Sequence, residues 1–177
     1  MSRLKLIKPS LDYEQQLIAY KVAFSKEHLY GGDHLSEYED IAQWLQYIER
    51  ASDKATCAQG RSPSTTFLCI RQNDQKMIGI CNIRHDLNQD FLLNIAGHIG
   101  YSILPSERGK GYGKQQLALA LQEAKKLDLN KVLVTCADWN KASERTIHAN
   151  GGVYEDTRLD ETDNDWMKRY WISLSDL

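Results

Sequence analysis

The sequence lacks any run of about 18 consecutive apolar residues, the length that a membrane-spanning helix requires. Its first nine residues contain no apolar stretch typical of a secretory signal. Lysine and arginine together number 22 and aspartate and glutamate 24, so the formal net charge is −2 and no broad basic field is available for nucleic acid. We therefore expect a cytoplasmic protein that binds neither membranes nor nucleic acids.

Cysteine is scarce as well, with four residues and no Cys-x-x-Cys pair. Three of them, Cys69, Cys81 and Cys136, lie within apolar runs typical of strands, which favours buried, reduced thiols. None stands near a histidine at the spacing of a zinc site, so we expect no bound metal. No cysteine is placed convincingly as a catalytic nucleophile.

A length of 177 residues suits one hydrophobic core better than two, so we expect a single domain over residues 1–177. Periodicity predicts strands over 4–7, 65–71, 77–85, 97–104, 131–136, 153–159 and 166–174, and helices over 11–29, 36–50, 114–127 and 141–150. Ser36 and Glu39 fit a capping box for the second helix, and residues 87–94 fit neither pattern.

The order of these elements predicts an α/β fold with a mixed, mostly antiparallel sheet. The strand–helix–strand stretch over residues 97–136 predicts a parallel pair with a right-handed crossover. The remaining strands follow one another as hairpins and predict antiparallel pairing.

A glycine-rich segment joins the strand over 97–104 to the clearest predicted helix. It reads Arg108-Gly109-Lys110-Gly111-Tyr112-Gly113-Lys114. Its alternating glycines let successive backbone N–H groups point inward without a Cβ in the way, and the following helix adds unpaired N–H groups and the positive end of its dipole. Arg108 and Lys110 supply full positive charge. The pattern predicts a pyrophosphate-binding loop, in preference to a turn that only caps a helix.

Three other nucleotide-binding loops fail on spacing. A Walker A loop would need a glycine where Arg108 stands and a serine or threonine where Gln115 stands. A dinucleotide-binding fingerprint would need a glycine at Lys114. A kinase-type loop needs the same glycine spacing and leads into a strand, whereas a helix is predicted here.

In this strand–loop–helix setting, residues 108–113 resemble the Arg/Gln-x-x-Gly-x-Gly/Ala signature of the GNAT superfamily of acyl-CoA N-acyltransferases. Residues 140–143 and 150–152 are similar to the family's Asn-x-x-Ala/Ser helix and its closing glycine. Residues 82–85 and 97–101 look like an uncharacterised bacterial branch of predicted acetyltransferases. The resemblance covers nearly the whole chain and implies the family fold, with helices on both faces of the sheet.

The resemblance implies an enzyme that transfers the acetyl group of acetyl-CoA to a primary amine by direct attack in a ternary complex. The backbone at Ile103 would bond the pantetheine arm, and Asn140 and Ser143 would contact it from the neighbouring strand end. The pyrophosphate would bind the N–H groups of Arg108, Gly109, Lys110, Gly111, Tyr112, Gly113 and Lys114. Asn140 is explained equally well as a helix N-cap, and one residue can serve both roles.

The sequence departs from the family at one functional position. Many members place a tyrosine seven residues after this asparagine, where it protonates the departing thiolate, but Ile147 stands there and is followed by His148. The missing tyrosine supports a second interpretation, a non-catalytic acyl-CoA-binding or regulatory module. Acyl transfer to a hydroxyl is a third, and no sequence feature favours it.

His98 and His85 are the predicted catalytic residues. Each lies at one end of a predicted strand, near the place where the sheet must open for the pantetheine. An attacking amine with a pKa of roughly 10.4 must lose a proton, and a histidine with a pKa near 6.5 is suited to accept it. Each is also explained as a hydrogen-bonded structural histidine, and Tyr101 is a further candidate for the same role.

The acceptor is predicted by class alone, as a small-molecule or peptide amine. Residues 30–47 hold four aromatic and four acidic side chains, an edge that suits a cationic amine. The same pattern is typical of a solvated helix face with its aromatic residues packed inward. His28 and His34 flank Gly31-Gly32 and are candidates for the same pocket. The state of assembly stays open, and a homodimer is among the alternatives.

Overall fold

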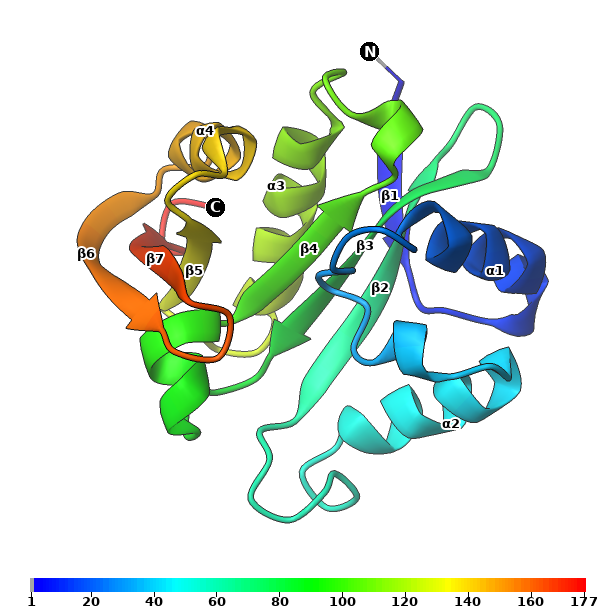
Figure 1. Cartoon of the computed structure of the whole chain (residues 1–177), viewed down its shortest axis with the longest axis horizontal. Helices are drawn as coiled ribbons and strands as arrows, with labels where there is room; N and C mark the ends of the chain where they lie inside the picture. Colours follow the sequence, from blue (N-terminus) through cyan, green and yellow to red (C-terminus); the bar gives the residue numbers. More distant parts are fainter. Residues whose placement is uncertain (1) are drawn as a thin grey trace.

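A computed structural model describes residues 2–177, and within them seven strands form two antiparallel sheets (Figure 1). The first sheet has the order β1-β2-β3-β4 and the second the order β5-β7-β6. The strands are β1 (Leu4–Ile7), β2 (Ser64–Arg71), β3 (Lys76–Arg84), β4 (Ile99–Ile103), β5 (Lys131–Ala137), β6 (Val153–Asp160) and β7 (Asp165–Ser173).

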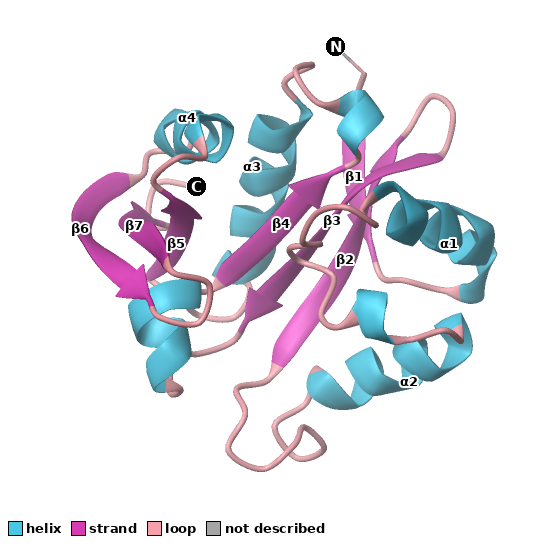
Figure 2. Ribbon diagram, viewed as in Figure 1, coloured by secondary structure: helices cyan, strands magenta, loops and turns pink. Residues whose placement is uncertain are grey.

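Helices cover both faces of the first sheet (Figure 2). They are α1 (Glu14–Ala23), α2 (Ile41–Ala51), α3 (Tyr112–Lys125) and α4 (Lys141–Ala149). The pair α1 and α2 packs on one face, α3 packs on the other, and α4 lies against α3 and β5. The predicted fold class, a mostly antiparallel architecture with helices on both faces, is confirmed.

The alternation of side chains along β2 explains why this sheet is buried on both sides. Leu68 and Ile70 face α1 and α2, whereas Cys69 between them faces the side of the sheet that α3 covers. On α2, helical spacing brings Trp44 and Ile48 to the sheet. Apolar side chains thus leave the sheet in both directions.

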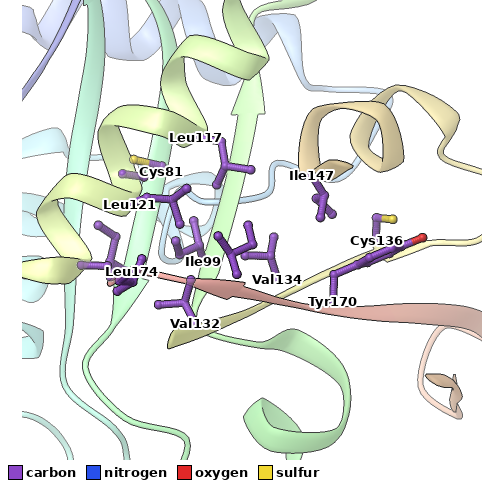
Figure 3. Packing of buried hydrophobic residues seen from close by; sticks show 14 residues of the cluster. Cys81, Ile99, Leu117, Leu121, Val132, Val134, Cys136, Ile147, Tyr170 and Leu174 are labelled. Carbon is purple, nitrogen blue, oxygen red and sulfur yellow. The ribbon is translucent and has the colours of Figure 1, made fainter. Parts of the chain in front are cut away.

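A second cluster of buried side chains joins the two sheets. Figure 3 shows side chains from β3, β4, β5 and α3 converging between the sheets. Ile147 points into this cluster from α4 and is completely buried. The position at which the resemblance would place a tyrosine therefore belongs to the core of this protein.

The predicted hydrogen-bonded parallel pair is wrong. Strands β4 and β5 run in the same direction (Figure 1), but they belong to different sheets. They are joined just before β4, where the His98 N–H donates to the Leu133 carbonyl at 2.7 Å and the Leu133 N–H donates to His98 Nδ1 at 2.9 Å. Beyond this point no ladder connects them within residues 2–177, and residues of both strands line one cavity. A splayed junction replaces the continuous sheet.

The predicted element boundaries agree with the structure to within two residues, except for the first two helices. The first α-helix ends at Ala23, because the N–H groups of Phe24 and Ser25 close tight turns onto Lys21 and Val22. The capping box at Ser36 is also wrong. Residues Leu35–Glu37 form a separate 3₁₀ turn, and α2 is capped by Asp40, whose carboxylate accepts the Ala42 N–H at 2.8 Å.

Short helical turns complete the chain: Leu11–Tyr13 and Pro105–Glu107 are 3₁₀ helices, and Leu92–Ala96 is a π-helix. None of the helices in residues 2–177 is both long and apolar enough to cross a membrane. The predicted cytoplasmic location stays a prediction.

Candidate functional site

A cavity of about 470 Å³ lies between β4 and β5. Its walls come from β3, β4, β5 and the start of α4, from the loop over residues 28–37, and from the acidic β6–β7 turn. Besides two histidines, its lining includes seven acidic or basic side chains, namely Asp33, Glu37, Arg61, Arg84, Asp160, Asp163 and Asp165. Because the sheets splay apart here, an extended ligand arm has space to enter between the strands.

The glycine-rich loop follows β4 and turns directly into α3. Gly109 has φ +75° and Gly111 has φ +79°, a left-handed conformation that other residues rarely adopt. Gly111 is the N-cap of α3 and has no side chain to satisfy the first N–H groups of the helix. A Cβ at Gly109 would meet no atom within 4 Å, so the loop faces open space. This geometry suits a bound anion.

Both cations of the loop already have partners. The Arg108 guanidinium lies 3.0 Å from the Glu27 carboxylate, and its Nε donates to the Ile103 carbonyl at 3.1 Å. Lys110 Nζ donates to Glu107 at 2.9 Å. These contacts place both charges beside the loop. Contact with a phosphate would require each to exchange its carboxylate partner.

Glu107 anchors the base of the loop, a role that no sequence pattern indicated. Its carboxylate is only 4% exposed and accepts from Lys76 at 2.8 Å, and from Arg71 and Lys110 at 2.9 Å each. The hydrogen bond from Lys76, reinforced by the other two cations, lowers the pKa of Glu107 to about 2. The loop is thereby tied to the hairpin between β2 and β3.

Replacing Glu107 with glutamine is expected to lower the free energy of unfolding by about 1–3 kcal/mol at pH 7, because its three cationic partners lose the buried carboxylate that they share. Urea denaturation measures this. The control is Glu123→Gln, which removes an ion pair with the exposed Lys126 and is expected to change stability by less than about 1 kcal/mol. Equal stabilities of the two variants would contradict the anchoring role.

The pH dependence of stability in the native protein and in Glu107→Gln gives a second test of the anchoring role. The pKa of Glu107 falls from its ordinary value of 4.5 to about 2 on folding, so its contribution is fully present above pH 4.5. That contribution is lost as the pH falls toward 2. The stability difference between the native protein and Glu107→Gln is therefore expected to shrink across this window.

A hydrogen bond between Tyr101 and Ser143 crosses the gap between β4 and β5. The hydroxyl of Tyr101, on β4, lies 2.6 Å from that of Ser143, on α4, and both residues line the cavity. The side chain of Asn140 accepts the Ser143 N–H at 3.1 Å, so the predicted N-cap of α4 is confirmed. Burial raises the pKa of Tyr101 well above 10. Tyr101 is therefore a proton donor at neutral pH, in contrast to the base that its sequence position suggested.

Neither of the two predicted bases, His98 and His85, lines the cavity. His98 is 4% exposed, its Nδ1 accepts the Leu133 N–H, and burial lowers its pKa to about 4. His85 Nε2 lies 2.7 Å from the Thr65 hydroxyl, and burial lowers its pKa too. On β2, Thr65 alternates with Ser64, which lines the cavity, so Thr65 faces the opposite side of the sheet. His98 instead joins the start of β4 to β5, at the end of the gap where the two strands meet.

The loop over residues 28–37 forms one wall of the cavity, and His28 and His34 lie in its lining as the sequence suggested. Aromatic side chains hold this loop from behind. Trp44 is fully buried and donates to the Asp33 carbonyl at 3.0 Å, and the Tyr47 hydroxyl donates to the Asp33 carboxylate at 3.2 Å. For Trp44 the inward-packing interpretation is confirmed.

Cys136 also lines the cavity, and burial raises the pKa of its thiol to about 11. It is therefore a neutral thiol at pH 7, which is a poor nucleophile. Among residues 2–177, no group of three or more histidine, cysteine or acidic side chains is arranged to hold a metal ion.

Residues 3–153 match a family model described as an acetyltransferase (GNAT) domain. A search of curated proteins found no match. Among solved structures, a chimera of the spermidine N-acetyltransferase SpeG from Vibrio cholerae and hSSAT aligns with a TM-score of 0.69 at 17% identity, over 99% of this chain and 98% of that one. The dodecameric spermidine N-acetyltransferase from Vibrio cholerae in an intermediate state aligns with a TM-score of 0.66 at 17% identity, over 98% and 94% of the two chains. At such identities these structures show the shared fold.

Proposed function

Because the chain belongs to the GNAT acetyltransferase family, we propose that it transfers the acetyl group of acetyl-CoA to a primary amine in a ternary complex. The observation that carries this proposal is a left-handed glycine loop at the start of α3, beside a cavity between splayed strands. We also propose that residues 1–177 act as a single domain, of which Met1 lies outside the described residues. One core cluster spanning both sheets supports this.

The residues present fit the donor well. The pantetheine arm is proposed to bond the backbone at Ile103 and to contact Asn140 and Ser143. The pyrophosphate is proposed to bind the N–H groups of Arg108, Gly109, Lys110, Gly111, Tyr112, Gly113 and Lys114. The cations of the loop then exchange their carboxylate partners for phosphate, which is supported by their positions directly beside the glycines.

Transfer requires a proton to reach the departing sulfur. The amine nitrogen attacks the thioester carbonyl carbon, the carbon–sulfur bond breaks, and the thiolate must be protonated as the amine loses its own proton. We propose that Ser143 donates this proton and is reprotonated by Tyr101, supported by their 2.6 Å contact. Tyr101 then regains a proton from solvent in the cavity, which receives in turn the proton that the amine loses. The apolar side chain at Ile147 is then no obstacle to catalysis.

The amine must also be held and deprotonated. Being neutral at pH 7 costs a lysine-like amine about 4–5 kcal/mol. The acidic side chains Asp33, Glu37, Asp160, Asp163 and Asp165 line the cavity and are proposed to attract the ammonium and to receive its proton. His98 and His85 are not retained as bases, because both have their hydrogen-bonding partners outside the cavity lining.

Direct transfer is proposed in preference to a covalent acyl-enzyme, since the raised pKa of Cys136 leaves the one cysteine in the described cavity lining protonated. An amine acceptor is further supported by the likeness to structures named as spermidine N-acetyltransferases. The named residues all come from one chain, so the proposed reaction does not require a second copy. The homodimer stays a prediction.

A thiol-release assay with acetyl-CoA and a panel of amines tests the proposed function. Thiol release is expected to depend on the amine and to exceed the rate with acetyl-CoA alone. A protein that binds acetyl-CoA by calorimetry but releases no thiol with any amine would instead be the non-catalytic module. Hydroxyl compounds in the same panel test transfer to oxygen.

A further inference from the structure

Arg84 is the one arginine among residues 2–177 that is shielded from solvent and has no carboxylate partner. Arg71, Arg158 and Arg169 are also partly or fully buried, and each forms an ion pair within 3.0 Å. The hydrogen bonds of Arg84 are long, from Nη1 to the carbonyls of Ala96 at 3.5 Å and Gly97 at 3.4 Å. A partly buried cation without a counterion is costly, which suggests that a ligand supplies the anion.

Arg84 lines the cavity, and its guanidinium lies beside a glycine on the neighbouring strand. A Cβ at Gly100 would lie 3.5 Å from Arg84 Nη1 and 3.6 Å from Nη2, so a larger residue there would crowd the charged group. The backbone of Gly31 closes the wall from the other side, since a Cβ on it would lie 2.7 Å from the Gly100 carbonyl oxygen. Arg84, Gly31 and Gly100 all line the cavity.

The acidic residue that acts electrostatically on Arg84 is Asp33, and its carboxylate is satisfied by other groups. Asp33 accepts from the Tyr47 hydroxyl at 3.2 Å and from the Ser64 hydroxyl at 3.4 Å. Burial lowers the pKa of Arg84, and the negative charge of Asp33 acts in the opposite direction. The two side chains nevertheless form no ion pair. A guanidinium stays charged at any working pH, and its planar donors match the two oxygens of a carboxylate.

The position of Arg84 relative to the transfer site limits which kind of ligand could supply the anion. Gly100, which the guanidinium approaches, directly precedes Tyr101, the residue proposed to supply a proton during transfer. An anion on Arg84 would therefore belong to a molecule whose amine lies close by, near the acidic Asp33. One wall of the cavity thus offers a positive and a negative group to the same small ligand.

This step rests on the proposed function. We propose that Arg84 binds a carboxylate of the acceptor, so that the acceptor is an amine that also carries a carboxylate, such as an amino acid. A polyamine has no group for Arg84, so the proposal separates this chain from acetyltransferases of polyamines.

The experiment compares amino acids with their own carboxamides as acceptors, with thiol release as the readout. The native protein is expected to favour the acid over the amide in kcat/KM by about 10- to 150-fold, the worth of one charge-assisted hydrogen-bonded pair. In Arg84→Met this preference is expected to disappear, and Arg84→Lys is expected to keep part of it. Calorimetry is expected to give both variants an unchanged Kd for acetyl-CoA.

Each other outcome counts against the proposal in a distinguishable way. If amines are acetylated but the native protein treats acid and amide alike, the carboxylate role falls while the proposed function stands, even where Arg84→Met does not fold. If Arg61→Met removes the preference and Arg84→Met does not, the exposed Arg61 of the cavity lining binds the carboxylate instead. If no amine releases thiol, the proposed function and this inference fall together.

Discussion

Replacing Gly111 with valine is expected to weaken acetyl-CoA binding by about 100-fold or more in isothermal titration calorimetry. Gly111 has φ +79°, which a β-branched residue does not adopt without strain. The loop must therefore shift, and the N–H groups around it lose their common direction. Two lost hydrogen bonds to phosphate, each worth about 1.5–3 kcal/mol, account for an effect of this size.

Gly60→Val is the matched control for this experiment. Gly60 has φ +76° in a loop remote from α3, and a Cβ there would meet no atom within 4 Å. It therefore introduces similar backbone strain without touching the glycine-rich loop, and its affinity for acetyl-CoA is expected to stay that of the native protein. A folded Gly111→Val protein with unchanged affinity would remove the loop from the donor site.

Removing the Tyr101 hydroxyl is expected to have the largest effect on turnover. In Tyr101→Phe, kcat is expected to fall by about 100- to 10,000-fold, the usual range for general acid catalysis. Ser143→Ala is expected to give a similar loss, because the two hydroxyls pass on the same proton. The Kd for acetyl-CoA is expected to change little in Tyr101→Phe, since that side chain is not proposed to bind the donor.

The pH profile and a control variant make this test specific. Burial raises the pKa of Tyr101 above its ordinary value of 10, so the hydroxyl stays protonated and no falling alkaline limb is expected below pH 10. Tyr154→Phe is the control, because Tyr154 is an exposed tyrosine whose hydroxyl lies 2.7 Å from that of Thr157 on β6. Near-native kcat in both Tyr101→Phe and Ser143→Ala would contradict the proposed proton donor.

The glycine-rich loop was predictable from the sequence because its chemistry is local. A strand, closely spaced glycines and a helix follow one another directly, and the structure places Gly109 and Gly111 in the left-handed conformation that the pattern requires. The helices and strands beyond the first two helices were predictable for the same reason, since their periodicity is a property of neighbouring residues.

The other half of the site depends on contacts between distant segments. Which end of the gap between β4 and β5 stays closed is decided by the bonds between His98 and Leu133, 35 residues apart, so the histidines could not be placed from the sequence. Tyr101 and Ser143 meet across that gap, 42 residues apart. The missing partner of Arg84 is likewise a property of the folded wall, because sequence alone does not show which carboxylates are within reach.

One reaction mixture tests direct acetyl transfer most directly. The protein is incubated with acetyl-CoA and an amine acceptor, released thiol is counted, and the masses of protein and acceptor are measured on the same sample. The account predicts one acetylated amine for each thiol released, with the mass of the protein unchanged. Thiol release without an acetylated amine, or an acetyl group accumulating on the protein before it reaches the acceptor, would contradict it.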